Sequence, residues 1–155
     1  MKRRLSGVTL IELMIVIVIM SILAILGVPL TSRWIYGAQV GESESLLAQG
    51  YAQMRAVALR NPNGVAGSTD AAGMKLADGV LYICKGSPTN ANCSAGGSAL
   101  VWQADLSRGA NVSVTLGGAA SGTIALDNMG VPRSSATARR YSISKGGESS
   151  SGLLE

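Results

Sequence analysis

The feature that most constrains this chain is an apolar run from Val8 to Val28 that contains a single charged residue, Glu12. About 20 apolar residues are enough to cross the hydrocarbon core of a bilayer as a helix. Three basic residues at positions 2–4 precede the run, so a spanning helix would keep its N-terminal end in the cytoplasm. A carboxylate inside such a helix costs about 2–3 kcal/mol unless it has a partner, so Glu12 requires an explanation.

Three interpretations of residues 1–29 compete. A secretory signal peptide has an apolar stretch of about 7–15 residues and a small-residue cleavage site after it, whereas this run is longer and no clear site follows it. A plain membrane anchor explains the basic residues and the apolar run but not Glu12. In the third interpretation a peptidase cuts before the run, between Gly7 and Val8, and removes the basic leader MKRRLSG.

The third interpretation gives Glu12 a partner. Cleavage would make Val8 the amino terminus and Glu12 the fifth residue of the mature chain. Residues four apart lie on one face of a helix, about 6 Å apart along its axis. In a filament, Glu12 of one subunit would then pair with the Val8 amine of its neighbour, and such a desolvated pair selects the register more than it adds stability. The sequence therefore predicts an assembly role for Glu12.

The stretch GVTLIEL resembles the prepilin signature of type IV pilins and type II secretion pseudopilins, although Val8 stands where that family most often has Phe. The resemblance implies cleavage by prepilin peptidase after Gly7 and N-methylation of Val8. It implies an inner-membrane anchor with a periplasmic C-terminal domain, and assembly with other pilin or pseudopilin subunits on an inner-membrane platform. It also implies an α+β fold in which a long N-terminal helix packs on an antiparallel β-sheet.

The helical pattern continues to about Arg60, where the sequence NPNG gives a stop signal. Pro29 is predicted to kink the helix near the end of the span; the simpler interpretation is that it only ends the span. Beyond it, apolar residues at helical spacing predict a stripe that packs on a sheet: Val40, Leu47, Tyr51, Met54 and Ala58. The predicted segments are a leader (1–7), a transmembrane or filament-core helix (8–29), an amphipathic helix (30–62) and a β-rich domain (63–155).

The C-terminal domain reads as short strands between glycine- and serine-rich turns. The strands are predicted at 79–84, 99–104, 111–116, 122–127 and 139–144. Several of them alternate apolar and polar residues, which suits an antiparallel sheet with one buried face. The final stretch, SKGGESSSGLLE, is predicted to be mobile.

Cys84 and Cys93 are the only thiols, and a loop rich in Ser, Pro and Asn separates them. Disulfides persist outside the cytoplasmic membrane, and a bridge that closes this loop would contribute about 2–3 kcal/mol. A metal site needs more ligands than two cysteines, and the chain has no histidine. The sequence therefore predicts a disulfide, and no metal or cofactor.

The rest of the chain is similar, in a more degenerate way, to the minor pilin group that contains FimU, FimT and GspH. The likeness rests on Arg55 and Ala58 in the helix, on the stretches YICKGSPTNANC and ALVWQAD, and on the phrase LDNMG from Leu126 to Gly130. It implies a minor pilin that primes, caps or joins a type IV pilus, or alternatively a type II secretion pseudopilin.

The charge distribution and the motifs limit which classes of function the chain can have. The net charge of +4 comes largely from positions 2–4, so the nearly neutral body gives no general argument for a nucleic-acid partner. No catalytic motif is visible, and we expect no enzyme. FimT-like pilins are associated with DNA uptake, and a DNA-binding alternative would place four basic side chains on phosphates: Arg133, Arg139, Arg140 and Lys145. The simpler interpretation is a solvated strand whose adjacent arginines point to opposite sides.

Overall fold

The structure is a computed structural model that describes residues 7–107 and 111–155, without the side chains of 26–30. The chain divides into two compact units, Met1–Ile35 and Tyr36–Glu155, and the helix α1 (Leu10–Arg60) contributes to both. Residues 1–6 of the leader and the side chain of Pro29 fall outside the described residues. The kink at Pro29 and the four predicted segment boundaries therefore stay predictions.

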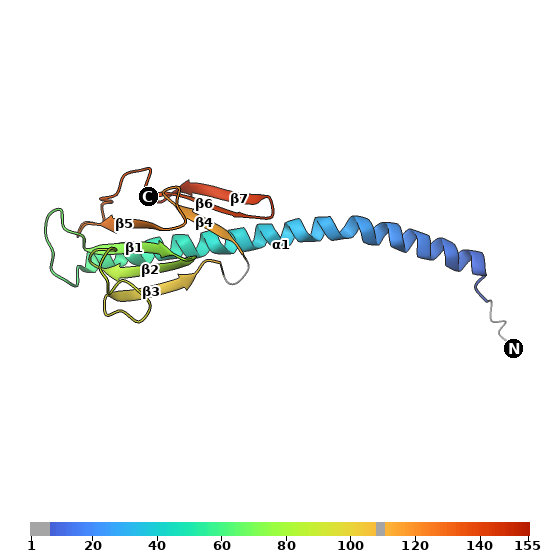
Figure 1. Ribbon diagram of the computed structural model, residues 1–155, viewed down its shortest axis with the longest axis horizontal. Coiled ribbons are helices and arrows are strands. Elements are labelled where there is room, and N and C mark those ends of the chain that lie inside the picture. Colours follow the sequence, from blue (N-terminus) through green and yellow to red (C-terminus); the bar gives the residue numbers. More distant parts are fainter. Residues whose placement is uncertain (1–6, 108–110) are drawn as a thin grey trace, which may run out of the picture. The chain divides into compact units, whose positions relative to one another are not determined.

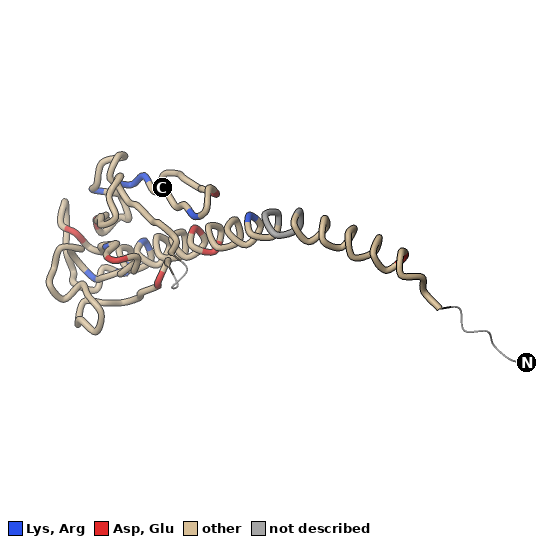
Figure 2. Tube along the Cα trace, turned by 45° about the vertical axis from the view of Figure 1, so that its right-hand side comes forward, with Lys and Arg blue, Asp and Glu red and all other residues tan. Residues whose placement is uncertain are grey.

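The first unit is helical from Leu10, and α1 continues through position 29 without a break in its assignment. Val8 was the expected first helical residue, and the helix begins two positions later because Thr9 caps it. Figure 2 shows this part of α1 almost without charge, in keeping with a sequence that has no ionisable residue between Glu12 and Arg33.

The second unit places two antiparallel sheets along the second half of α1 (Figure 1). One sheet has the strand order β3-β2-β1-β5 and the other the order β4-β6-β7. The strands are β1 (Ala72–Ala77), β2 (Val80–Lys85), β3 (Leu100–Asp105), β4 (Ser113–Leu116), β5 (Gly122–Leu126), β6 (Arg140–Lys145) and β7 (Glu148–Leu153). The α+β fold with antiparallel strands is confirmed, with two sheets where a single one was expected.

The core of the second unit lies between α1 and the sheets. All five residues of the predicted apolar stripe are buried, and Leu47, Met54 and Ala58 are at most 1% exposed. Gly50 lets the helix approach the first sheet closely, since a Cβ there would lie 2.5 Å from Leu81 Cδ2. The prediction that this stripe is core is confirmed.

Strand β1 was not predicted, although it is a central strand between β2 and β5. Its sequence AGMKLA is poor in the β-branched and aromatic residues that favour strands. The missed signal is the dipeptide Asp78–Gly79, in which both residues have positive φ angles (51° and 76°). Two such residues form the two-residue hairpin turn that joins β1 to β2, because that turn matches the twist of the strands.

The C-terminal stretch was predicted to be mobile, and that prediction was wrong. Its residues Glu148–Leu153 form β7, which pairs along its whole length with β6. Gly146 and Gly147, with φ angles of 56° and 91°, make the tight turn between the two strands. Leu154 beyond the strand is buried in the core, so tertiary packing orders a segment whose composition favours disorder.

Candidate functional site

The start of α1 is capped by Thr9. Thr9 is the N-cap residue: its carbonyl accepts the Leu13 N–H at 3.2 Å, and its hydroxyl oxygen accepts the Glu12 N–H at 3.3 Å. The sequence Thr-x-x-Glu at an N-terminus is the pattern in which Thr caps the third helical residue. Gly7 and Val8 precede the helix as exposed, non-helical chain. The predicted cleavage bond therefore lies outside the helix.

The N-cap was not predicted, although the pattern Thr-x-x-Glu from Thr9 to Glu12 is its sequence signal. As the third helical residue, Glu12 lies near the positive end of the helix dipole, where a carboxylate is favoured. Among the described residues, its carboxylate has no hydrogen-bond or ion-pair partner. The cap thus fixes the backbone of Glu12 at the helix start, while its carboxylate makes no bond within the described residues.

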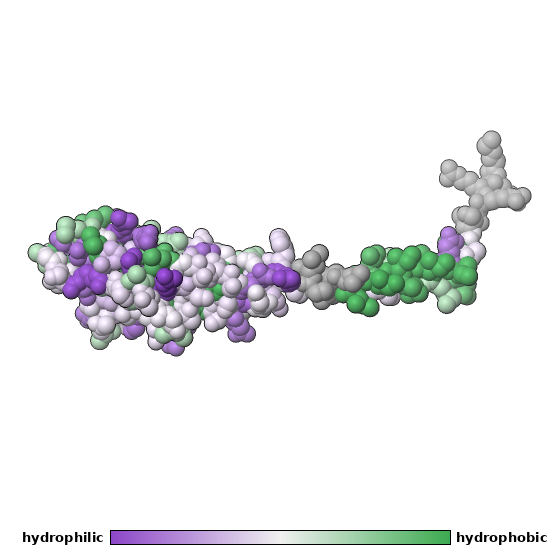
Figure 3. Space-filling view, turned by 90° about the horizontal axis from the view of Figure 1, so that it is seen from above, coloured by the Kyte–Doolittle hydropathy of each residue, from purple (hydrophilic) through white to green (hydrophobic). Residues whose placement is uncertain are grey.

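The apolar segment that follows Glu12 is exposed on every side. From Leu13 to Ile25 its large hydrophobic side chains are between 45% and 74% exposed, and Figure 3 shows hydrophobic side chains on the visible face of this segment. A helix that is hydrophobic all round is stable when buried on all sides. Within the described residues, no helix meets the combined requirements of length and hydropathy for a membrane span.

Comparison with known proteins identifies this segment. Residues 2–28 match the family model described as the prokaryotic N-terminal methylation motif. The match covers the predicted cleavage bond, Glu12 and most of the apolar segment, and it supports a type IV pilin-like protein. It points to a structural subunit that associates with other pilin subunits and with the prepilin peptidase. No curated protein and no solved structure matches the chain.

A second polar cluster joins α1 to the second sheet. The Tyr141 hydroxyl on β6 donates to Glu44 Oε1 at 2.7 Å, and the Ser150 hydroxyl on β7 donates to Glu44 Oε2 at 2.9 Å. The hydrogen bonds from Tyr141 and then Ser150 lower the pKa of Glu44 below its ordinary value of 4.5. The hydrogen bond to Glu44 raises the pKa of Tyr141 above its ordinary value of 10.0. Both strands of the C-terminal hairpin are thus tied to one carboxylate.

We expect Tyr141→Phe to lower the free energy of unfolding by about 1 kcal/mol, because it removes one partly exposed, charge-assisted hydrogen bond. The loss is largest between about pH 5 and pH 10. Below that window Glu44 becomes protonated as the pH falls through its lowered pKa, and above it Tyr141 ionises as the pH rises through its raised pKa. Denaturant unfolding of the full chain in detergent, repeated at several pH values, measures this effect.

Tyr82→Phe is the matched control for this prediction. Tyr82 lies on β2, and among the described residues its hydroxyl makes no hydrogen bond. Its loss should change the unfolding free energy by less than about 0.5 kcal/mol with no dependence on pH. Equal losses in the two variants would contradict the proposed contribution of the Glu44 cluster.

Two of the four basic residues of the DNA-binding alternative are engaged within their own domain. Arg133 Nη1 lies 3.5 Å from Asp70 Oδ1. Arg139 Nη1 donates to the Leu154 carbonyl at 2.6 Å, and the Leu154 N–H donates to the Arg139 carbonyl at 3.1 Å. These bonds fasten the end of the chain to the residue before β6, which favours a structural role for Arg139.

The other two lie at opposite ends of β6. Arg140 begins the strand and is exposed, whereas Lys145 ends it, about 17 Å further along. Lys145 Nζ lies 5.5 Å from the centroid of the Tyr36 ring, within range of a cation–π contact. The hairpin tip packs on the same ring, since a Cβ at Gly146 would overlap Tyr36. Two of the four side chains thus have partners within the domain and the other two lie at opposite ends of one strand, and DNA binding through them stays a prediction.

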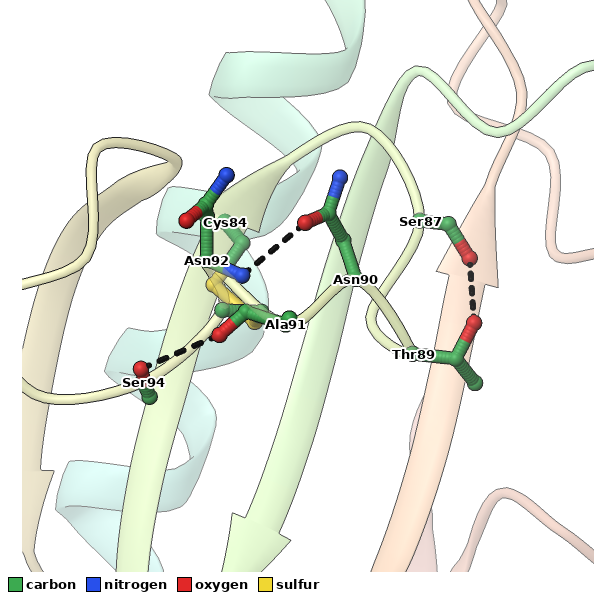
Figure 4. Close-up of a disulfide and its surroundings, with 8 residues drawn as sticks. Cys84, Ser87, Thr89, Asn90, Ala91, Asn92 and Ser94 are labelled. Atoms are coloured by element: carbon green, nitrogen blue, oxygen red, sulfur yellow. Dashed lines mark hydrogen bonds between the residues drawn. A yellow bond between two sulfur atoms is a disulfide. The ribbon is translucent and has the colours of Figure 1, made fainter.

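The predicted disulfide between Cys84 and Cys93 is present, with a Cα–Cα distance of 5.6 Å (Figure 4). Both cysteines are fully buried. The loop between them folds back over β1, because a Cβ at Gly73 would lie 2.5 Å from the backbone nitrogen of Pro88. Among the described residues, no group of three or more His, Cys, Asp or Glu side chains is arranged to hold a metal ion.

Proposed function

We propose that this chain is a minor subunit of a type IV pilus, cut by prepilin peptidase between Gly7 and Val8 and N-methylated at Val8. One observation carries the proposal: an apolar helix exposed on every side begins at a capped end with a carboxylate in its first turn. Such a helix requires lipid around it before assembly and other helices around it afterwards. The methylation motif over residues 2–28 supports the same assignment.

In the filament, Glu12 pairs with the Val8 amine of a neighbouring subunit. The Thr9 cap supports this role because it fixes the backbone of Glu12 through the Thr9 hydroxyl. Both groups are removed from water when the helices assemble, so each needs the other. The pair sets the register between subunits, while the apolar side chains supply the contact area.

Before assembly, the subunit lies in the inner membrane with residues 36–155 in the periplasm. The buried disulfide supports this location, since such bonds persist in that oxidising compartment. An assembly platform in the inner membrane then transfers the helix from lipid to the filament. A pseudopilin of a type II secretion system would use the same chemistry. Its presence in sheared pili, compared with secretion in a strain that lacks it, distinguishes the two.

Gly7→Val tests the processing step. The added side chain at the cleavage bond should block cleavage, so the subunit keeps its leader, fractionates with the membrane and is absent from sheared filaments. Mass spectrometry of the purified chain measures the result, because the cut chain begins with methylated Val8 and the uncut chain with the leader.

Gly37→Ala is the matched control, because a Cβ at Gly37 meets nothing within 4 Å. This variant should be cut and methylated like the natural chain. Normal cleavage of the Gly7→Val chain, or a natural chain whose amino terminus is not Val8, would contradict the proposed processing site.

A further inference from the structure

Trp34 is an exposed aromatic side chain on the part of α1 that follows the apolar run. Its side chain is 77% exposed, as much as that of Leu10 at the start of the helix, and Ile35 next to it is 43% exposed. Arg33 precedes it and is also exposed. The other tryptophan, Trp102, is half-buried on β3 in the second unit, where its ring approaches Gly50. Packing within the chain therefore accounts for an aromatic side chain at Trp102 but not for the exposed one at Trp34.

The position of Trp34 matches the border of a bilayer. The segment between Glu12 and Arg33 contains roughly 20 residues and none of them is ionisable. At 1.5 Å per residue this helical segment is about 30 Å long, which is the thickness of a typical hydrocarbon core. Arg33 then lies at the outer border, and Trp34 lies just beyond it.

We propose that Trp34, together with Arg33, binds the phospholipid headgroup layer at the outer border of the span and sets the depth of the helix before assembly. The proposal rests on the membrane-anchored state of the proposed function. Tryptophan favours this layer because its ring is apolar while its N–H donates to lipid carbonyl or phosphate oxygens. A guanidinium beside it pairs with lipid phosphate in a charge-assisted contact. The partner is therefore a phospholipid surface.

Depth-dependent fluorescence quenching tests the proposal. The mature full-length chain carrying Trp102→Phe, so that Trp34 is its single tryptophan, is reconstituted in phosphatidylethanolamine–phosphatidylglycerol vesicles. Brominated phosphatidylcholine is added with the bromines near the headgroup or near the chain ends. We expect quenching to be at least about twofold stronger with the shallow bromines, because an interfacial indole lies at their depth.

The chain itself provides the matched control. In the Trp34→Phe variant the single tryptophan is Trp102, which belongs to the second unit and should not be quenched by either lipid. Stronger quenching of Trp34 by the deep bromines would place it in the hydrocarbon and overturn the proposal. An absence of quenching would overturn it too, and would favour a protein contact for Trp34.

Carbonate extraction of the same vesicles separates this proposal from the proposed function. A chain that resists extraction but shows no shallow quenching of Trp34 leaves the membrane-anchored pilin intact and overturns the interfacial role. A chain that is fully extracted overturns both.

Discussion

Glu12→Gln is expected to leave the subunit in the membrane and to reduce its incorporation into filaments by about a hundredfold or more. Glutamine removes the charge but still suits the third helical position, because a capping box accepts either residue there. The neighbouring Val8 amine would then be desolvated without a partner, and removing one member of a buried ion pair costs about 3–5 kcal/mol. The ratio of subunit in sheared filaments to subunit in the membrane, measured by immunoblotting, gives the effect.

Thr9→Val separates the charge of Glu12 from the effect of the helix cap. This variant loses the hydroxyl that accepts the Glu12 N–H and weakens the helix start by about 1 kcal/mol, but it keeps the carboxylate. Incorporation should fall only several-fold. If the two variants lose incorporation equally, Glu12 acts through the cap. If Glu12→Gln is incorporated normally, the proposed ion pair is wrong.

The double variant Cys84→Ala/Cys93→Ala is expected to destabilise the second unit by about 3 kcal/mol. The disulfide closes a loop of about ten residues, and the loop-entropy model gives a stabilisation of this size. For a unit of this length the melting temperature should fall by about 10 °C. Thermal unfolding of the full chain in detergent, followed by near-ultraviolet circular dichroism, measures the shift.

Two comparisons control for the substitutions themselves. Reduction of the natural chain should produce nearly the same shift without any change of side chain. Ser94→Ala removes only the hydrogen bond from its hydroxyl to the Ala91 carbonyl near the surface and should cost less than about 0.5 kcal/mol. Equal melting temperatures of the oxidised and reduced chains would contradict the stabilising role of the disulfide.

The parts of the fold that follow a hydrophobic period were predictable. The stripe on the second half of α1 repeats at helical spacing, and it is buried as expected. Strands β2, β3, β5 and β6 lie within one residue or two of the predicted ranges, because they are rich in residues that favour strands. Strand β1 lacks such residues and depends on its neighbours β2 and β5 on both sides.

The site was predictable where its signals are local. The methylation motif and the Thr9 cap can both be recognised from a few adjacent residues. The Glu44 cluster cannot, since its hydrogen bonds join residues 97 and 106 positions apart. Neither the serine-rich sequence of β7 nor the apolar spacing of α1 indicates which face of the helix the hairpin meets.

Because the hairpin of β6 and β7 is hydrogen-bonded to Glu44, the second unit can fold completely only after this hairpin has been synthesised. A ribosome makes α1 before β6 and β7, so Glu44 is synthesised long before its two hydrogen-bond partners. Contacts across about 100 residues also close slowly, because a long loop must be ordered before they form. Until these contacts form, the face of α1 that carries Glu44 is not packed against the hairpin. A chain truncated before Ser150 would keep the methylation motif but lose the Ser150 bond to Glu44, so we expect proteases to cut its second unit faster than that of the intact chain.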